Sequence, residues 1–315
     1  MFRPRLIIEI LAAGVLLGLA VPGVAALSGI GHRWVDIFAQ FTAPALTAAV
    51  VASLAVLLLK FRRAAMVGGA AVLVLLAAVW PQWTPPKGRA APDAPVMTVF
   101  SANLWARNTD TARMRRSIEA ADADVLVLIE VGPAADRDLE ALLAGYPHRV
   151  ANLREGSEGD PARSIIASRW PVTEIADRND GLASVGAVVA GPLGPVNVLG
   201  VHLTRPWPFQ YQWGQITQVM AINDIRRDLT GPVIVAGDFN SVSSARIGRQ
   251  MKQEVGLIPA PGFPGTWPSF APSFAGMTID QVWRSPDLTL LDRRLGKPTG
   301  SDHRPVVTRF SRARP

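Results

Sequence analysis

The residues with the clearest chemical potential lie in four short segments, each at the end of an apolar run. The segments are Asp124–Glu130, Val201–Leu203, Gly237–Asn240 and Gly300–His303. An upstream Asn103 and a downstream Asp280 complete the set. Hydrolysis of a phosphate ester requires a hard cation, an activated water and a cationic or proton-donating group around one phosphorus. The carboxylates, amides and imidazoles of this set supply all three.

Two of the segments carry carboxylates where a strand would leave the core. Glu130 follows five apolar residues, and Mg²⁺ is usually held by one or two carboxylates together with water and phosphate oxygens. Asp238 and Asn240 are two residues apart on an extended segment and so share a face, which suits activation of water by Asp238 and donation to the phosphate by Asn240. Asn103 offers a neutral oxygen near the metal. The alternative for all four is an ordinary solvated or capping role at a strand end or turn.

The histidines are of two kinds. His32 and His148 lie in predicted loops, and we assign no catalytic role to them. His202 ends a predicted strand, and His303 follows Ser-Asp before the last predicted strand. An imidazolium beside a phosphate stabilises the charge of the transition state and can protonate the leaving oxygen. Asp280 would hold His303 in the correct tautomer or, alternatively, cap a turn. A structural role is the alternative for both strand-end histidines.

The first part of the chain is typical of a membrane anchor. Its three apolar runs span Leu6–Leu27, Phe41–Leu59 and Ala64–Trp80. A helix needs about 20 residues to cross a bilayer, with about 17 the minimum. Basic side chains precede the first run and separate the second from the third, at Arg3, Arg5, Lys60, Arg62 and Arg63. The positive-inside rule makes both places cytoplasmic and puts everything after the third run outside the cytoplasm. A cleaved signal peptide is the alternative for the first run, and a miscounted third run would reverse the location.

Charge and composition separate the anchor from the rest. The net charge is +7, yet residues 96–315 hold 24 basic against 22 acidic side chains. Most of the excess therefore belongs to the anchor, which weakens a nucleic-acid interpretation of the high charge. The chain has no cysteine, which excludes disulfides, thiolate nucleophiles and zinc–thiolate sites. We predict an anchor over 1–83, an extended Pro/Ala-rich linker over 84–95 and a catalytic domain over 96–315.

Short apolar runs alternate with amphipathic stretches beyond the linker, which predicts an α/β domain. Gly-Pro turns near 191–195 predict a hairpin and hence mixed sheets. Strands are predicted over 96–100, 125–129, 164–167, 185–189, 196–201, 233–236, 279–283 and 306–310. Helices are predicted over 110–121, 134–143, 210–227 and 244–254.

The ordered set of polar residues resembles the motif series of the endonuclease/exonuclease/phosphatase superfamily, which includes nucleases, sphingomyelinases and inositol-phosphate 5-phosphatases. The matching positions are Asn103, Glu130, His202, Asp238, Asn240, Asp280, Asp302 and His303, supported by Arg163–Arg169 and Gly265–Trp267. The resemblance covers about residues 96 to 311. It implies a four-layer α/β sandwich of two mixed β-sheets flanked by helices, here preceded by three transmembrane helices, with a Mg²⁺- or Mn²⁺-dependent site at one sheet edge.

The resemblance also implies a role for each position. Glu130 would ligate the metal, with Asn103 and Asp302 beside it. Asp238 would activate the water and Asn240 would stabilise the phosphate. His303 would contact the transition state, with support from Asp280. His202 would be the second histidine on the phosphate side and the candidate general acid.

Two departures from the family pattern are visible. Gln281 follows Asp280 where many members have His or Tyr, which leaves the aspartate intact but changes its neighbour. The acidic partner that orients His202 is not evident, and the candidates are Glu158 and Asp160.

The segment after His202 bears on the substrate, because four of its residues are aromatic: Trp207, Phe209, Tyr211 and Trp213. Such rings stack on bases or insert at a lipid headgroup boundary, while Arg205 would contact a phosphate. Alternatively, Phe209 and Trp213 anchor the next helix in the core. We predict a multi-pass cell-membrane phosphodiesterase that binds substrate through Arg205 and Trp207, with a nuclease slightly favoured and no obligate protein partner. The alternatives are a sphingomyelinase-like phospholipid or inositol-phosphate phosphoesterase and a catalytically idle binding module.

Overall fold

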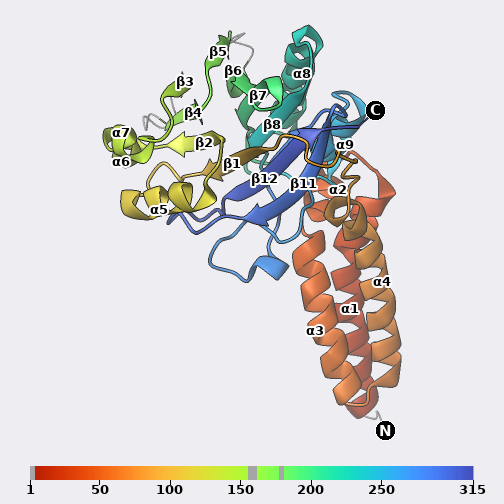
Figure 1. Cartoon of the computed structure of the whole chain (residues 1–315). Helices are drawn as coiled ribbons and strands as arrows, with labels where there is room; N and C mark the ends of the chain where they lie inside the picture. Colours follow the sequence, from red (N-terminus) through yellow and green to blue (C-terminus); the bar gives the residue numbers. More distant parts are fainter. Residues whose placement is uncertain (1–3, 155–161, 177–180, 315) are drawn as a thin grey trace.

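A computed structural model describes residues 4–154, 162–176 and 181–314. A bundle of long helices projects from a mixed α/β domain, and the N-terminus lies at the far end of the bundle (Figure 1). The bundle consists of α1 (Pro4–Ser28), α3 (Thr42–Leu58) and α4 (Arg62–Trp83), with a short α2 (Arg33–Ala39) between α1 and α3. The three long helices coincide with the predicted apolar runs, whereas α2 was not predicted.

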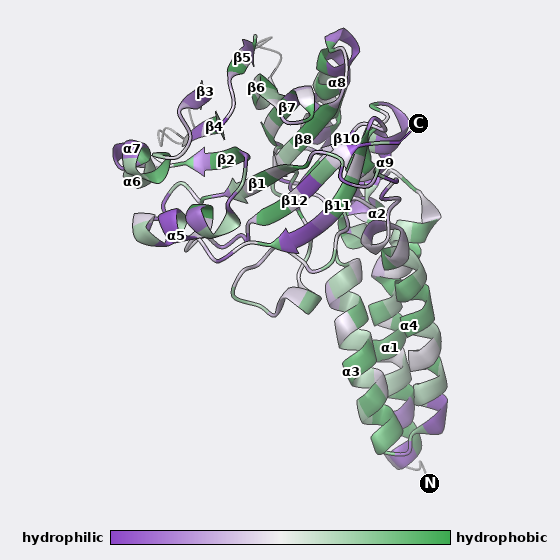
Figure 2. Ribbon diagram, viewed as in Figure 1, coloured by the Kyte–Doolittle hydropathy of each residue, from purple (hydrophilic) through white to green (hydrophobic). Residues whose placement is uncertain are grey.

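Most of the surface of the bundle is apolar. It is almost uniformly hydrophobic, and its hydrophilic residues gather at the end away from the domain (Figure 2). α1 and α4 are each long and apolar enough to cross a membrane, and α2 with α3, bent by 59°, passes the same test as one broken span. Alanines such as Ala49, Ala64 and Ala71 are buried between the helices, while leucines such as Leu11 and Leu58 face outward. This inside-out arrangement suits helices that pack in lipid.

The α/β domain contains two six-stranded sheets, ordered β11-β12-β1-β2-β4-β3 and β5-β6-β7-β8-β10-β9. The first sheet is built from β1 (Met97–Asn103), β2 (Val125–Val131), β3 (His148–Arg154), β4 (Ala162–Ser168), β11 (Leu288–Leu295) and β12 (Val306–Arg312). The second is built from β5 (Val172–Ile175), β6 (Ala183–Gly191), β7 (Gly194–His202), β8 (Val233–Asp238), β9 (Ile258–Pro259) and β10 (Asp280–Arg284). Each sheet has one parallel pair, β1 with β2 and β7 with β8. Both sheets are therefore mixed, as predicted.

Apolar side chains from both sheets fill the space between them. Val99 and Val127 of the first sheet meet Val198 and Ile234 of the second in one buried cluster. Burial of each such side chain contributes about 1.5–3 kcal/mol. The sheets approach closely at Gly200, where a Cβ atom would lie 2.9 Å from side-chain carbon atoms of neighbouring valines. A larger residue there would push the two sheets apart.

Helices cover the outer face of each sheet. α5 (Thr111–Ala121), α6 (Pro133–Arg137) and α7 (Leu139–Leu142) pack on the first sheet, and α8 (Gln212–Asp228) and α9 (Arg246–Gln253) pack on the second. α5 begins where predicted because the Asp110 carboxylate accepts from the Arg113 amide at 3.0 Å, which caps the helix. The predicted four-layer sandwich is confirmed.

Some elements differ from the predictions. His148 begins β3 instead of lying in a loop, and β5, β9 and β11 were not predicted because they are short or rich in charged residues. Residues 86–89 of the predicted linker are hydrogen-bonded to the domain. The Arg284 guanidinium donates to Pro86 O at 2.7 Å, Leu290 N donates to Lys87 O at 2.9 Å, and further bonds tie residue 89 to the domain.

Candidate active site

The ends of four strands bring polar side chains from both sheets together. Asn103 ends β1 and Glu130 lies near the end of β2, while His202 and Asp238 end β7 and β8. The Asn103 amide nitrogen donates to Glu130 Oε1 at 2.8 Å and to Asp238 Oδ2 at 3.0 Å. A single side chain thus joins carboxylates from two sheets. The parallel pairing within each sheet explains this, because parallel strands end at the same edge.

The backbone is unusual at three places around this edge. Glu130 has φ 54° and Asn240 has φ 48°, left-handed values that cost energy for residues other than glycine and are often found at functional sites. The register between β2 and β4 shifts between Leu128 and Val131, so Glu130 sits in a bulge that turns it out of the ladder. Gly237 has φ 142°, and a Cβ there would lie 2.0 Å from Val201 O. Only glycine allows β8 to deliver Asp238 next to β7.

Two imidazoles flank the Asp238 carboxylate. His202 Nε2 lies 3.5 Å from Glu130 Oε1 and 3.8 Å from Asp238 Oδ2. His303 Nε2 lies 3.9 Å from the same Asp238 oxygen. Its other ring nitrogen, Nδ1, lies 2.9 Å from Asp280 Oδ2. The predicted support of His303 by Asp280 is therefore present, and it leaves Nε2 facing Asp238.

Burial and neighbouring charges set the protonation of the cluster. Burial raises the pKa of Asp238, and the nearby Asp280 carboxylate adds to that rise. Burial also opposes ionisation of Glu130, but the His202 imidazole and the Asn103 amide outweigh it and hold the Glu130 pKa below its usual range. Burial opposes protonation of His303, yet Asp280 and then Asp238 raise the pKa of His303 to about 10. At neutral pH the cluster therefore contains an ionised Glu130 and an imidazolium at His303.

Two overlapping groups of side chains in the described part of the chain could hold a metal ion. One is Glu130, His202 and Asp238, and the other is Asp238, Asp280 and His303. The first group fits a resident cation better because the Asp280 carboxylate already accepts from His303. The carboxylate oxygens of Glu130 and Asp238 are the ligands that suit Mg²⁺ or Mn²⁺, which leaves the His202 imidazole free for another role. The donor set therefore fits the divalent metal on which enzymes of this superfamily depend.

The other two predicted metal residues are placed differently from the expectation. The Asn103 amide oxygen accepts from Trp105 N at 2.9 Å, so its nitrogen and not its oxygen faces the carboxylates. Asn103 thus orients the carboxylates in this structure. Asp302 lies outside both metal-compatible groups: its Oδ2 accepts from the Trp267 indole at 3.3 Å, and its Oδ1 is 3.9 Å from His303 Nε2.

Asn240 is fixed beside Asp238 by two hydrogen bonds. Its backbone N–H donates to Asp238 Oδ1 at 2.8 Å, and its side-chain nitrogen donates to Leu203 O at 2.9 Å. Two buried glutamines, absent from the predicted site, hold the surrounding loops. Gln215 of α8 donates to Phe239 O at 3.2 Å, and Gln281 donates to the carbonyl of the residue after Asn240. Gln281 was noted as a departure from the family pattern, whereas no local signal marks Gln215.

The two predicted substrate-binding residues, Arg205 and Trp207, have surroundings that differ from those of the cluster. Arg205 is exposed. The Trp207 ring packs edge-to-face on Trp34 of α2, with centroids 5.3 Å apart, and the Arg33 guanidinium lies 4.6 Å from the Trp207 ring centroid. These contacts of Trp207 are thus to the N-terminal helical part of the chain. Its role in binding substrate stays a prediction.

Other predictions near this segment have clear outcomes. Phe209 and Trp213 are largely exposed, so the interpretation that they anchor α8 in the core is wrong. Glu158 and Asp160, the candidate partners of His202, lie outside the described residues. In their place the structure puts Glu130 next to His202.

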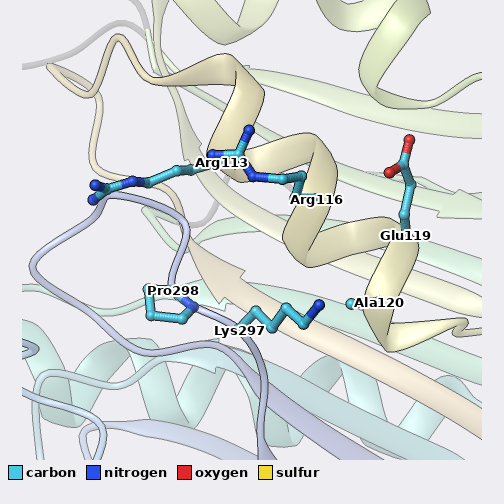
Figure 3. A pocket seen from close by; sticks show the side chains of 6 residues that line it. All are labelled: Arg113, Arg116, Glu119, Ala120, Lys297 and Pro298. Atoms are coloured by element: carbon cyan, nitrogen blue, oxygen red, sulfur yellow. The ribbon is translucent and has the colours of Figure 1, made fainter.

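A surface hollow of about 730 Å³ lies apart from the cluster, between α5 and the loop that follows β11 (Figure 3). Its lining consists of Arg113, Arg116, Glu119, Ala120, Lys297 and Pro298. None of these belongs to the carboxylate–histidine cluster, and Arg113 is paired with Asp110 at 3.1 Å. The hollow is therefore a basic surface feature and not the centre of the chemistry.

Comparison with known proteins agrees with the geometry of the site. A family model described as the Endonuclease/Exonuclease/phosphatase family matches residues 100–303. The chain belongs to this family. A UPF0294 protein of Vibrio cholerae is 39% identical to this endonuclease/exonuclease/phosphatase family member over 95 residues, which is 30% of this chain and 32% of the relative. The match spans about a third of the relative's length.

Solved structures of the endonuclease/exonuclease/phosphatase family share the fold. A family protein from Beutenbergia cavernae has a TM-score of 0.56 at 20% identity, covering 69% of this chain and 72% of that one. The human Nocturnin catalytic domain has a TM-score of 0.53 at 16% identity, covering 73% and 100%. Sphingomyelinase C from Streptomyces griseocarneus has a TM-score of 0.50 at 18% identity, covering 70% and 100%. Family members are divalent-metal-dependent phosphoric ester hydrolases.

Proposed function

We propose that this family member is a membrane-held, divalent-metal-dependent phosphodiesterase that hydrolyses its substrate with activated water. The observation that carries the proposal is the convergence of Glu130, His202, Asp238 and His303 from both sheets around one carboxylate-rich space. Glu130 would hold Mg²⁺ or Mn²⁺, with Asn103 and Asp302 nearby. When bound, the ion neutralises phosphate charge. A catalytically idle module would not require two strained backbone positions at this edge.

Each remaining side chain has a separate role in the proposed reaction. Asp238 orients the water and takes its proton as the water oxygen bonds to phosphorus. Asn240 donates to a phosphate oxygen, and the His303 imidazolium, held by Asp280, stabilises the charge that builds there. The bond from phosphorus to the leaving oxygen breaks, and His202 supplies the proton to that oxygen.

The proposed location is a cell membrane that the chain crosses three times. The domain lies at the end of the bundle formed by the start of α3 and the end of α4, where Gln82 Nε2 donates to Thr42 Oγ1 at 3.3 Å. The basic turn Lys60–Arg63 lies at the other end, so the positive-inside rule supports a catalytic domain outside the cytoplasm. An alkaline phosphatase reporter fused after Trp83 should be active, and an inactive reporter would reverse this orientation.

Turnover of bis-para-nitrophenyl phosphate by the full chain in detergent tests the chemistry. Activity should require Mg²⁺ or Mn²⁺, disappear with a chelator and return when metal is added. Asp238→Asn and His303→Gln should each lower kcat by about 10²-fold or more, because a positioned proton acceptor or charge donor is lost. Asp224→Asn on the exposed face of α8 is the matched control. Wild-type turnover in either active-site variant would contradict the mechanism, and a folded but inactive wild-type chain would favour the idle module.

A further inference from the structure

The most exposed aromatic side chains in the described part of the chain belong to two segments that border the active site. They are Phe270 at 87% exposure, Tyr211 at 79%, Phe209 at 72% and Trp213 at 65%. Each segment places more than one exposed aromatic side chain within a few residues, and exposed apolar patches mark interaction surfaces. We call the segments 209–213 and 268–276 the aromatic rim.

The 268–276 segment is held firmly and is attached to the active site. The Arg304 guanidinium donates to the carbonyls of Pro268 and Ser269, at 3.1 and 2.8 Å, and also to that of Ala271. Ser269 N donates to Asp302 O at 2.7 Å. The rings of this segment are therefore displayed from a fixed backbone that continues directly into the catalytic residues.

The same segment lies beside a helix of the membrane bundle. The Thr47 hydroxyl of α3 donates to Phe274 O at 3.4 Å. Thr47 is five residues after the start of α3, roughly 7.5 Å along the helix axis. Figure 1 shows this blue loop, with its short 3-10 turn η1 (Ser273–Ala275), reaching down beside the upper part of α3. Phe270 and Phe274 are thus exposed next to a surface that is itself apolar.

The 209–213 segment is attached to α2, which leads directly into α3. Gln212 Nε2 donates to Asp36 Oδ2 at 3.2 Å, and Asp36 Oδ1 accepts from Arg246 N at 2.8 Å. Gln40 Oε1 accepts from Val242 N at 2.8 Å. These buried contacts fix the domain on the bundle, so the domain cannot turn its aromatic rim away from the membrane.

We infer that the aromatic rim rests in the surface of the bilayer that holds α1, α3 and α4, and that the substrate is a phosphodiester carried by a lipid of that bilayer. The inference rests on the proposed membrane location and hydrolytic function. Phe, Tyr and Trp favour the boundary between water and hydrocarbon. One part of the rim follows His202 and the other is bonded to Asp302, so a phosphate at headgroup depth reaches the site without leaving the leaflet. Nucleic acid, the other candidate substrate, becomes an outcome of the test.

The rim itself can be located without measuring activity, because the chain has no cysteine. Phe270→Cys and Phe209→Cys are labelled with an environment-sensitive fluorophore in vesicles of phosphatidylcholine and phosphatidylglycerol that contain spin-labelled lipid. Both labels should be quenched by the lipid spin label. Trp170→Cys is the control, because Trp170 is 39% exposed and follows β4 at the sheet edge opposite the site. Quenching at positions 270 and 209 no greater than at 170 would overturn the inference.

The substrate class is tested with two esters of the same leaving group. Hexadecyl para-nitrophenyl phosphate is anchored in the vesicles, and ethyl para-nitrophenyl phosphate stays in water. In both, water adds to phosphorus and the bond to the nitrophenyl oxygen breaks. The reconstituted chain should favour the anchored ester in kcat/KM by about tenfold or more, and Phe270→Ser with Phe209→Ser should remove about tenfold of that ratio. Trp170→Ser should keep the wild-type ratio.

The outcomes separate this inference from the proposed function. Equal use of the two esters by the wild-type chain, an unchanged ratio in the double variant, or faster cleavage of a short oligonucleotide than of the anchored ester would each overturn the lipid substrate. Failure to hydrolyse either ester with Mg²⁺ or Mn²⁺ would overturn the proposed chemistry. In that case the quenching experiment still decides whether the rim contacts the bilayer.

Discussion

The pair formed by Asp280 and His303 shows how single residues set the charge of the site. Their side chains are 2.9 Å apart and buried, and together with Asp238 the Asp280 carboxylate raises the pKa of His303 to about 10. A raised pKa means that the folded protein binds this proton more tightly than the unfolded chain does. The pair therefore stabilises the fold fully below the ordinary histidine pKa of about 6.5, and that stability is lost as the pH rises through about 10.

Replacement of Asp280 should release this proton. In metal-free Asp280→Asn the pKa of His303 should fall toward its ordinary value. The negative charge that favours the imidazolium most is gone, while the burial that disfavours the imidazolium remains. Nitrogen NMR of the histidine-labelled chain, which contains four histidines, measures this directly. At pH 8 the His303 ring should be protonated in the wild-type chain and mostly neutral in the variant. Asp224→Asn is the control, and a His303 titration that is the same in wild type and Asp280→Asn would refute the assignment.

Sequence reasoning identified the residues of the site better than their orientations. Glu130 and Asp238 were predictable because each carboxylate follows an apolar strand, and such positions meet at one sheet edge. The direction of the Asn103 amide was not predictable, because amide oxygen and nitrogen differ only in the partners that the fold supplies. Gln215 was not predicted, because the sequence of an amphipathic helix does not show whether one of its glutamines faces solvent or a catalytic loop.

The short helix α2 leads into a residue that contacts the catalytic loop. Gln40 follows this helix and is buried. Its amide nitrogen donates to Ser241 Oγ at 3.1 Å, and its oxygen accepts from Val242 N at 2.8 Å. Ser241 and Val242 come directly after Asn240, and Gln281 holds the Ser241 carbonyl from the other side. The loop that presents Asn240 is therefore clamped between β10 and the segment that follows α2.

Loss of this clamp should be measurable in Gln40→Leu. The side chain keeps most of its volume, but the buried Val242 N–H loses its acceptor, which costs about 1–3 kcal/mol. We expect the free energy of unfolding of the detergent-solubilised chain to fall by about that amount, and kcat to fall more than KM changes. Gln253→Leu on the exposed end of α9 is the matched control. If chemical denaturation gives the same stability for Gln40→Leu and wild type, the clamp makes no net contribution.

The elements that were not predicted lack a continuous local pattern in the sequence. The strands β3, β5 and β11 lie near or at sheet edges, where one face meets solvent and charged residues interrupt the apolar pattern. The short α2 depends on partners about 200 positions away in sequence, such as Val242 and Arg246. In contrast, the central strands were predictable because burial on both faces produces continuous apolar runs, and the long helices were predictable because their apolar runs have the length that a membrane span requires.

For the whole molecule, the connection between the predicted anchor and the domain is made by many contacts. Gly262 N donates to Gln82 O at 2.7 Å, Trp83 packs on Phe263 with ring centroids 4.8 Å apart, and residues 86–89 bond to the domain near β11. The contacts of α2 adjoin the catalytic loop, whereas residues 86–89 bond at the opposite end of the strands, because Leu290 pairs with Phe310 and Phe310 pairs with Met97 at the start of β1. The N-terminal helical part thus supplies structure to the α/β domain.

Removal of the anchor should therefore loosen the catalytic edge while the sandwich persists. In residues 96–315 alone, the amides of Val242, Arg246 and Gly262 lose their acceptors, whereas the central strands keep all of theirs. Hydrogen exchange followed by mass spectrometry should show faster exchange in peptides that contain these amides than in the full chain, and unchanged exchange in peptides from β2 and β8. Exchange at the catalytic edge as slow as in the full chain would show that the anchor is only a tether. Faster exchange throughout both sheets would show instead that the domain cannot fold without its anchor, because local loss of partners affects only the segments that the partners hold.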